Sequence, residues 1–342
     1  MKLTPKQRER YSRMLALHDF DEEDMEALMS TTVSVVGAGG LGSPALRLLA
    51  AIGFGRIRII DQDIVELSNI QRQTVYNTED IGKPKAESAA TNLARMNPEV
   101  DLEPISVHLD DSNAVEILRG SDVIVDGLDS FRTRNVVNRA SQALGIPYVF
   151  AGAIEYHSNL STFIPGETGC LYCLAGDAED DPDYTCALVG VTPELLSIVA
   201  AVQVREALLI ATGRKARLRD RLMMVDLNTL TFDFFEIGRN EKCPICSAPS
   251  KDSTSESSEG PTAAILCGGT IRIAPARMTL IDTKTIAKRV SSSYKVKESN
   301  RWLTVETPAG LKITLMARGN AIVKGTDSEE EALALYQEIM RD

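Results

Sequence analysis

The chain has 342 residues, of which 44% are hydrophobic and 25% are charged, an ordinary composition for a globular protein of two or three domains. Its 37 Lys and Arg residues against 48 Asp and Glu residues leave a formal net charge of −11, which argues against a protein whose main task is to grip a nucleic-acid backbone. The most apolar stretch, residues 195–212, is interrupted by Gln203, Arg205 and Glu206, and the N-terminus lacks the apolar core of a signal peptide. We therefore expect a cytoplasmic protein with neither a membrane span nor a nucleic-acid partner.

Strands and helices are expected to alternate over the first part of the chain. A β-branched run at 33–36 leads through a glycine-rich turn into a helix whose apolar residues lie between 41 and 52, and a strand follows at 56–60. The alternation continues with helices at 85–96 and 133–144 and strands at 102–107, 122–126 and 147–151. Parallel strands joined by helices predict an α/β fold with a doubly wound, Rossmann-like and mostly parallel sheet.

The pattern changes after residue 151, where the regular alternation stops. We expect an antiparallel extension of the sheet at 159–164, an acidic proline-containing loop at 176–184, a helix at 193–211 and a later strand within 223–237.

A second, smaller domain is expected to follow a linker. Residues 247–262 are rich in Ser, Glu and Pro and have no large apolar side chain, so they cannot bury enough surface to order themselves. We therefore divide the chain into a first domain at 1–248, a linker at 249–262 and a small α+β domain at 263–342. In that last domain we expect strands at 271–273, 301–306, 311–316 and 321–324, a hairpin turn at 308–310, and helices at 282–290 and 328–340.

The turn between the first strand and the first helix has a glycine-rich motif. Gly37, Gly39 and Gly42 fit the pattern G-x-G-x-x-G, and Gly40 adds a fourth glycine. Such glycines permit a tight turn and let backbone N–H groups approach a phosphate at a helix N-terminus, whose dipole favours anions. Asp61 ends the next strand and is expected to hydrogen-bond the hydroxyls of a ribose, unless it is only a solvated turn carboxylate. The motif therefore predicts a nucleotide site.

The residues that follow distinguish one nucleotide from another. Arg72 and Lys85 supply cations near the glycine turn, and Asp129 comes just after the strand at 122–126. NAD keeps its pyrophosphate intact and needs no such cations, whereas phosphate chemistry needs positive charge and a carboxylate that holds Mg²⁺. We therefore expect ATP and Mg²⁺, with an NAD-dependent oxidoreductase as the alternative.

These motifs resemble those of the E1-like activating enzymes, the MoeB/ThiF/HesA-type adenylyltransferases that activate ubiquitin-like sulfur carriers for molybdopterin or thiamin synthesis or tRNA thiolation. The resemblance is carried by RYSRM at 10–14, GAGGLGSP at 37–44, DQDIVELSNIQRQ at 61–73, GKPK at 82–85 and GLDS at 127–130, together with the cysteine pairs and TCALVGVTP around Cys186. It covers residues 5–248.

The resemblance implies a role for each matching residue. Asp129 would hold Mg²⁺, Arg72 and Lys85 would contact the phosphates, and Arg13 would reach into the site of the neighbouring subunit of a homodimer. For Arg13 and Lys85 the alternative is a solvated surface charge. Ser130 stands where the family commonly has Asn. The nucleotide-binding set is Gly37, Gly39, Gly40, Gly42, Asp61, Asp63, Ser68, Asn69, Ile70, Gln71, Arg72, Lys85, Asp129 and Ser130.

The activity that the resemblance implies is adenylation of the C-terminal glycine of a small β-grasp, ubiquitin-like protein ending in Gly-Gly, which gives an acyl-adenylate and pyrophosphate. A carboxylate nucleophile is ionised at pH 7 and needs no general base, which agrees with the scattered positions of His18, His108 and His157. Two further alternatives are a non-catalytic partner subunit of a heterodimeric E1, which usually lacks one of these charged residues, and a relative that adenylates RNA or a small metabolite.

Four of the six cysteines form two C-x-x-C pairs. Cys170, Cys173, Cys243 and Cys246 can close a tetrahedron of thiolates, which predicts a structural zinc site. The alternative is a thioredoxin-like redox pair at Cys243 and Cys246, which would leave the first pair unexplained.

The other two cysteines stand alone. Cys186 resembles the family's cysteine that receives the activated carrier as a thioester or acyl-disulfide, and the alternative is a small buried residue. Cys267 opens the last domain, as a persulfide carrier or as a buried small residue. That domain is too short for a rhodanese, so we expect no rhodanese activity, and its sequence leaves carrier docking and dimer support open.

Overall fold

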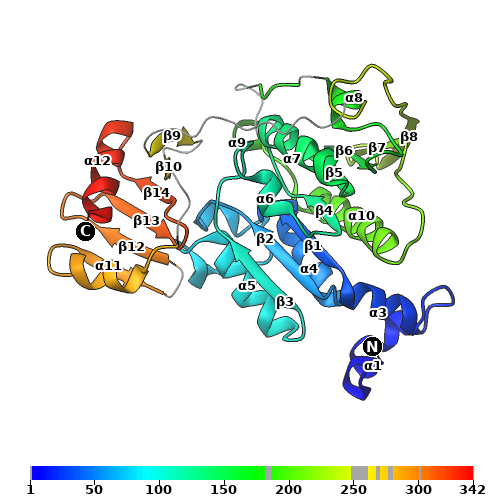
Figure 1. Cartoon of the computed structure of the whole chain (residues 1–342), viewed down its shortest axis with the longest axis horizontal. Coiled ribbons are helices and arrows are strands. Elements are labelled where there is room, and N and C mark those ends of the chain that lie inside the picture. Colours follow the sequence, from blue (N-terminus) through cyan, green and yellow to red (C-terminus); the bar gives the residue numbers. More distant parts are fainter. Residues whose placement is uncertain are drawn as a thin grey trace.

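The structure is a computed structural model that describes residues 2–176, 178–181, 186–247, 261–266, 270–275, 280–299 and 302–341. Within these residues the chain forms two units, one built on an eight-stranded sheet and the other on a six-stranded sheet. Figure 1 shows the two units side by side. The predicted linker lies outside the described residues except for its end, where β9 (Thr262–Leu266) begins.

The large sheet contains the predicted doubly wound core. Its strands lie in the order β3-β2-β1-β4-β5-β6-β7-β8. Pairs from β3 to β5 are parallel, and pairs from β5 to β8 are antiparallel. The strands are β1 (Thr32–Val36), β2 (Arg56–Ile60), β3 (Asp101–Ile105), β4 (Val123–Asp126), β5 (Tyr148–Ile154), β6 (His157–Phe163), β7 (Arg221–Asp226) and β8 (Thr231–Glu236). The chain order reverses between β1 and β4, and in such sheets ligands bind beyond the strand ends at that point.

Helices cover both faces of this sheet (Figure 1). On one face Leu46, Ala89 and Val204 pack against alternate strand residues such as Val35, whereas Val137 packs against the opposite face. The helices of the first face are α3 (Glu22–Ser30), α4 (Gly42–Ile52), α5 (Lys85–Met96) and α10 (Pro193–Ala211), and those of the second are α6 (Ala114–Leu118) and α7 (Phe131–Leu144). Burial on both faces accounts for the continuous apolar runs of the central strands.

The later strand that was expected within 223–237 is two strands. The chain reverses between β7 and β8 because the Asp226 carboxylate accepts hydrogen bonds from the Asn228 N–H (2.8 Å) and the Thr229 hydroxyl (2.9 Å), and Leu230 adopts a positive φ of 55°. The strand β8 is exposed along its whole length. The prediction of one strand was wrong because the strand-forming residues on both sides, LMMV at 222–225 and TFDFF at 231–235, hid the short turn between them.

The C-terminal unit is the predicted small α+β domain. Its sheet has the order β11-β12-β13-β14-β10-β9, every pair is antiparallel, and two helices cover one face. Sequence analysis did not predict β9 or β11. The further elements are β10 (Thr270–Ala274), α11 (Thr283–Val290), β11 (Lys295–Glu298), β12 (Trp302–Glu306), β13 (Lys312–Met316), β14 (Ala321–Lys324) and α12 (Glu329–Met340). The predicted hairpin turn lies between β12 and β13, where Gly310 has a φ of 89°.

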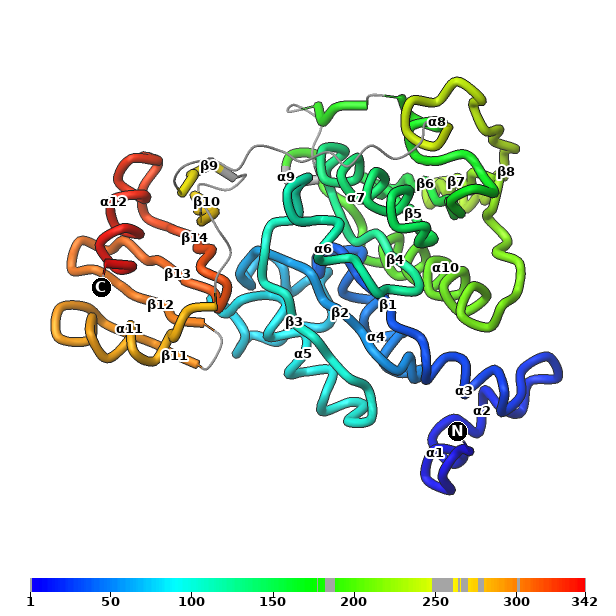
Figure 2. The backbone as a smooth tube through the Cα atoms, viewed as in Figure 1, coloured from blue at the N-terminus to red at the C-terminus, as the bar shows by residue number. Residues whose placement is uncertain are grey.

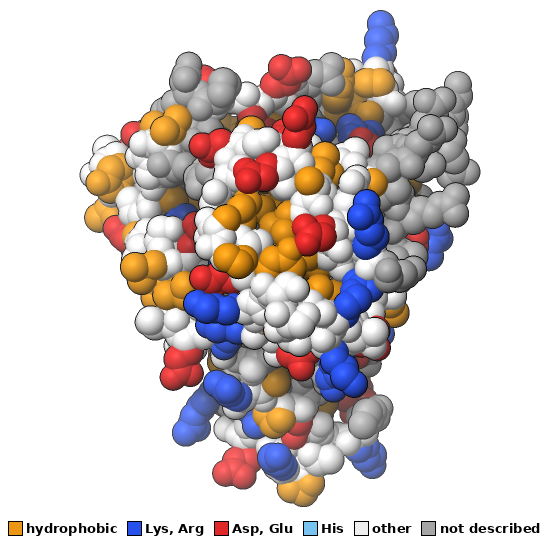
Figure 3. Space-filling view, turned by 90° about the vertical axis from the view of Figure 1, so that its left-hand side faces the viewer, with side chains coloured by type: hydrophobic (Ala, Val, Ile, Leu, Met, Phe, Trp, Pro, Cys, Tyr) orange, Lys and Arg blue, Asp and Glu red, His pale blue; other side chains and the backbone are white. Residues whose placement is uncertain are grey.

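Figure 3 views the end of the molecule that the C-terminal domain forms, where apolar side chains gather between charged ones. Partly buried residues such as Leu333 and Met340 pack against the core of this domain from outside.

At the other end of the molecule lie helices that sequence analysis did not predict, which Figure 2 traces from the N-terminus. They are α1 (Pro5–Arg10) and α2 (Ser12–Leu15), which lead into α3. Among the described residues, no helix is both long and apolar enough to cross a bilayer.

Candidate functional site

The glycine turn lies between β1 and α4, against the turn that follows β4. Gly37 has a φ of 90°, and a Cβ on it would overlap the carbonyl of Gly127. A Cβ on Gly42 would overlap the carbonyl oxygen of Gly37. A Cβ on Gly39 would be in ordinary van der Waals contact, 3.9 Å from the Gln73 Nε2, and a Cβ on Gly40 would lie 2.9 Å from the Leu196 Cδ1 and 3.8 Å from the Arg72 Nε. Two of the predicted glycines are therefore required by packing of the turn, and Gly40 faces Leu196 and Arg72.

Asp61 connects the glycine turn to the end of β2. One carboxylate oxygen accepts a hydrogen bond from the Ala38 N–H (2.7 Å), and the other accepts one from the Asp63 N–H (2.7 Å). Burial raises the pKa of Asp61, although Lys85 opposes this effect. Each carboxylate oxygen has a second lone pair, so the group can still accept hydrogen bonds from a ribose.

Lys85 is the buried cation of the site. Its Nζ lies 3.0 Å from an Asp63 carboxylate oxygen, and its backbone N–H donates to the Asp63 carbonyl (2.8 Å) at the start of α5. Burial lowers the pKa of Lys85, but Asp63, Asp61 and Asp129 together raise it above its ordinary value. Lys85 is therefore charged at every physiological pH, and the surface alternative for this residue is wrong. We call Asp61, Asp63, Lys85 and Asp129 the Lys85 cluster.

The segment between Asp63 and Lys85 contains the polar residues expected around the phosphates. Asn69 is buried, and its Oδ1 accepts a hydrogen bond from the Glu66 N–H (3.1 Å) within a single 3₁₀ turn (Leu67–Asn69). The Arg72 guanidinium donates to the Ser68 carbonyl (2.9 Å). Ile70 is half-buried against the core, whereas Gln71 is exposed. Asn69 thus shapes this turn, and Arg72 closes it.

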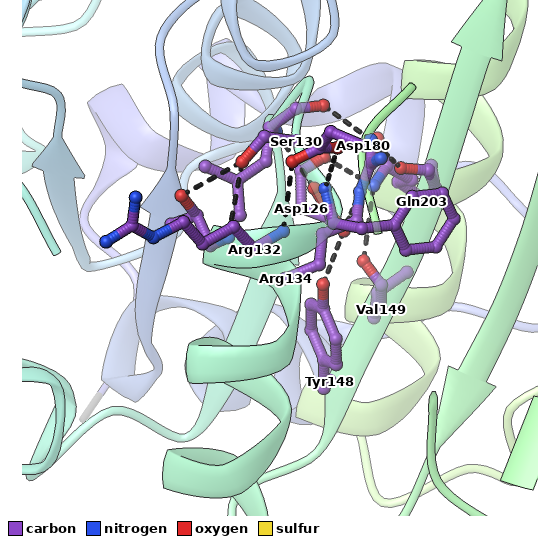
Figure 4. Close-up of polar contacts among 12 residues, drawn as sticks. Asp126, Ser130, Arg132, Arg134, Tyr148, Val149, Asp180 and Gln203 are labelled. Carbon is purple, nitrogen blue, oxygen red and sulfur yellow. Dashed lines mark hydrogen bonds and ion pairs between the residues drawn. The ribbon is translucent and has the colours of Figure 1, made fainter. Parts of the chain in front are cut away.

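Asp129 and Ser130 stand at the start of α7. Asp129 is exposed, and its charge reaches Lys85. Ser130 is the N-cap of α7, because its hydroxyl accepts a hydrogen bond from the Thr133 N–H (3.2 Å). Ser and Asn are both good N-caps, so this departure from the family pattern preserves the helix start. From the acidic loop, the Asp180 carboxylate accepts from the N–H groups of Phe131 (2.6 Å) and Arg132 (3.3 Å), as Figure 4 shows.

A buried polar network, whose residues Asp126, Arg134 and Tyr148 are labelled in Figure 4, lies close to the backbone that carries Asp129. The Asp126 carboxylate accepts hydrogen bonds from the Arg134 Nε (3.2 Å) and from the Tyr148 hydroxyl. Arg134 also donates to the carbonyls of Leu128 (2.6 Å) and Ala151 (2.9 Å). Burial raises the pKa of Asp126, whereas Arg134 lowers it. The network ties the backbone next to Asp129 to two strands and so positions that carboxylate.

Sequence analysis missed this network and the contact of Asp180. The available signal was Asp126 itself, a carboxylate that ends the apolar run DVIVD, because a buried charge requires a partner. The partner could not be identified from the sequence, since Tyr148 lies 22 residues away on another strand.

Arg13 does not join the Lys85 cluster within one chain. It is exposed on α2, and no contact between it and that cluster occurs among the residues that the structure describes. A contribution of Arg13 to the site of a second subunit therefore stays a prediction.

The four cysteines of the two C-x-x-C pairs converge. The Sγ atoms of Cys170 and Cys243 are 3.7 Å apart, those of Cys173 and Cys246 are 3.5 Å apart, and all four lie within 4.8 Å of one another. One pair lies at the start of the short helix α8 (Leu171–Ala175), with Cys170 as its N-cap, and the other lies in the turns after β8. This arrangement includes both pairs, so it disfavours an isolated redox pair at Cys243 and Cys246.

The other cysteines lie at the limits of the described residues. Cys186 begins the short helix α9 (Cys186–Val189), which precedes α10. Its side chain is not among the described ones, so its proposed role stays a prediction. Cys267 lies outside the described residues.

The sequence of this chain is similar to those of known proteins over most of its length. The ThiF family matches residues 11–245. A SAMP-activating enzyme E1 of Haloferax volcanii is 38% identical over 256 residues, which cover 74% of this chain and 94% of the relative. A sulfur carrier protein ThiS adenylyltransferase of Bacillus subtilis is 30% identical over 340 residues, which cover 96% of this chain and 98% of the relative. The second similarity therefore extends through the C-terminal domain.

Solved structures share the fold of the larger unit. A crystal structure of E. coli MccB with MccA-N7isoASN matches with a TM-score of 0.63 at 22% identity, over 70% of this chain and 75% of that chain. The predicted doubly wound fold with its antiparallel extension is confirmed.

Replacing Arg134 tests the buried network. Arg134→Met leaves the Asp126 carboxylate buried without its cation, so we expect the free energy of unfolding to fall by about 3–5 kcal/mol. Arg139→Met is the matched control, because Arg139 lies on the same helix and pairs with Asp111 at the surface, where an ion pair contributes less than about 1 kcal/mol. Denaturant unfolding of both variants checks the prediction, and equal destabilisation would contradict it.

Proposed function

Because the chain belongs to the ThiF family, we propose that it is an adenylyltransferase that uses ATP to activate the C-terminal glycine of a small ubiquitin-like sulfur-carrier protein. The observation that carries the proposal is the buried, charged Lys85 between Asp63 and Asp61, beside a glycine turn at the carboxyl edge of the sheet. This edge is where the doubly wound fold binds nucleotides.

The proposed reaction is a displacement at the α-phosphorus of ATP. A carboxylate oxygen of the carrier's terminal glycine forms a bond to the α-phosphorus, and the bond from that phosphorus to the bridging oxygen of pyrophosphate breaks. The attacking carboxylate is ionised at pH 7, so no side chain has to remove a proton. Positive charge from Lys85 and Arg72 stabilises the negative charge that develops on the phosphate oxygens.

Asp129 fits the role of a magnesium ligand. It is exposed, follows a parallel strand and lies near Lys85, and carboxylate oxygens are the ligands that Mg²⁺ prefers. Bound Mg²⁺ would supply charge neutralisation at the phosphates. The Arg134 network holds the backbone beside Asp129 in place.

The partner is proposed from the names of the relatives. One relative is a SAMP-activating enzyme and another acts on the sulfur carrier ThiS. We propose a β-grasp carrier ending in Gly-Gly, and a homodimer in which Arg13 of one subunit serves the site of the other. The exposed position of Arg13 on α2 leaves it available for such a contact.

Replacing Asp129 tests the activity. We expect Asp129→Ala to lower ATP–pyrophosphate exchange in the presence of the carrier by at least about 10²–10³-fold, because it removes the proposed magnesium ligand. Asp111→Ala is the matched control, since Asp111 is a carboxylate paired with Arg139 at the surface, and it should exchange normally. Near-normal exchange by Asp129→Ala would refute the assignment.

The four-cysteine cluster fits a structural zinc ion. A tetrahedron of thiolates at about 2.3 Å from a metal places the sulfur atoms about 3.8 Å apart, close to the 3.7 Å and 3.5 Å observed here. Four protein ligands leave no open position, so the ion would hold two segments together and take no part in the reaction.

Removing one thiolate tests the zinc site. We expect one zinc per wild-type chain by elemental analysis, and Cys243→Ser should lose it and melt roughly 10 °C lower, because the two segments are no longer linked. Cys267→Ser, which changes a cysteine outside the cluster, should keep the zinc. Wild-type protein with four free thiols and no zinc would contradict the site.

Cys186 is proposed to receive the activated carrier. The support is its position just before α10 in the segment that resembles the family's acceptor cysteine. Its thiolate would attack the carbonyl carbon of the acyl-adenylate and release AMP. Cys186→Ala should therefore keep pyrophosphate exchange and lose any carrier conjugate that thiols cleave, as seen by electrophoresis without reductant. A thiol-sensitive conjugate that persists in Cys186→Ala would argue against this role.

A further inference from the structure

The C-terminal domain packs on the segment that carries the nucleotide site. Ile64, which follows Asp63, forms an apolar cluster with Met316 and Ile322 from the outer face of the C-terminal sheet. Beside this cluster, Lys324 forms an ion pair with Glu66. The helices α11 and α12 cover the opposite face of that sheet, so its outer face is the one that contacts the segment after β2.

Arg272 lies on this outer face, next to the apolar cluster. In the antiparallel pair of β10 and β14, Arg272 stands directly opposite Ile322, so the two side chains share a face. Since Ile322 contacts Ile64, Arg272 lies beside the end of β2 where Asp63 holds Lys85.

The surroundings of Arg272 are rich in charge and leave it poorly paired. Its Nε is buried and has no hydrogen-bond partner among the described residues. Asp110, Arg132 and Asp63 lie near enough for their charges to act on it. Burial, together with Arg272 and Arg132, lowers the pKa of His108 to about 4, although Asp110 opposes the shift. Arg132 is exposed and Arg272 is partly buried, and an anion that binds between two neighbouring arginines is attracted by both charges.

The balance of charge along the chain fits this picture. Residues 263–342 contain 12 Lys and Arg against 9 Asp and Glu, although the whole chain has a net charge of −11. The C-terminal domain therefore carries net positive charge, and two of its cations, Arg272 and Lys324, lie near Asp63 and Glu66, which follow β2.

We propose that the C-terminal domain completes the nucleotide site. In this proposal Arg272 binds a phosphate group of ATP from the side of the Lys85 cluster that faces the C-terminal sheet. This inference rests on the proposed function. It assigns to the C-terminal domain a direct part in binding the nucleotide, with Arg272 as a binding residue and the contacts of Ile64 and Glu66 as the means that position it.

Replacing Arg272 in the full-length chain tests the proposal. Arg272→Gln should weaken ATP binding about 10–100-fold by calorimetry, the range expected when a charged hydrogen bond is lost. Binding of adenosine, which has no phosphate, should be unchanged. Lys295→Gln is the matched control, because it removes one charge from an exposed position on β11 and should bind ATP like wild type.

A second measurement reports on position. The chain has three histidines, so the titration of His108 can be followed by NMR, and Arg272→Gln should raise its pKa because a neighbouring cation is gone. Normal ATP affinity in Arg272→Gln, equal weakening of adenosine, or an unchanged His108 pKa would each overturn the inference. If wild-type protein neither binds ATP nor catalyses exchange, the proposed function itself fails, so the two failures are distinguishable.

Discussion

Backbone contact between the two central turns of the sheet determines where the functional residues can lie. A Cβ on either Gly42 or Gly127 would overlap the carbonyl oxygen of Gly37. Because none of these residues has a side chain, the turn after β1 packs against the turn after β4. That contact brings Asp61 and Asp129, which follow different strands, to one edge of the sheet. A bulky residue at any of these glycines would separate the parts of the site.

The buried charge of Lys85 is compensated by carboxylates before any nucleotide binds. Lys85 is buried, and it keeps its charge because Asp63 and Asp61 compensate for the lost hydration. The same principle operates behind the site, where Arg134 neutralises the buried Asp126. Side chains held in this way need little rearrangement when a substrate binds, which is how a preorganised site lowers the cost of reaction. Arg272 of the C-terminal domain adds a further cation close to Asp63.

Local pattern was enough to predict much of the fold. The helices α5 and α10 and the strand β2 have the bounds that their periodicity predicted, since apolar spacing and nearby Pro or Gly residues mark them. The strand β11 was not predicted because its sequence, KVKE, is polar and it forms a strand by pairing with β12. Helix α2, which carries Arg13, is a single turn without a side-chain cap and left no signal of its own.

In the site, too, residues within local motifs were predicted, and residues that depend on contacts between distant segments were missed. Lys85, Asp61 and the glycines were predicted because motifs keep them close in sequence. Arg134 was missed because its role as the partner of Asp126 depends on the burial of that carboxylate and on Tyr148, which lies on the neighbouring strand. Arg272 was missed for a stronger reason, since its charged neighbours Asp63, Asp110 and Arg132 lie far earlier in the chain and meet it only where the two domains pack together.

The cysteine cluster has a consequence for the unfolded chain. Its two pairs are 73 residues apart, and the segment between them includes α10 and the strands β7 and β8. An ion that stays bound to all four sulfur atoms would act as a cross-link and close this segment into a ring. By the chain-entropy relation used for cross-links, a ring of that size removes conformational freedom worth about 4 kcal/mol from the denatured ensemble. The strands β7 and β8 and the helix α10 within this ring would then resist thermal unfolding without any addition to their apolar core.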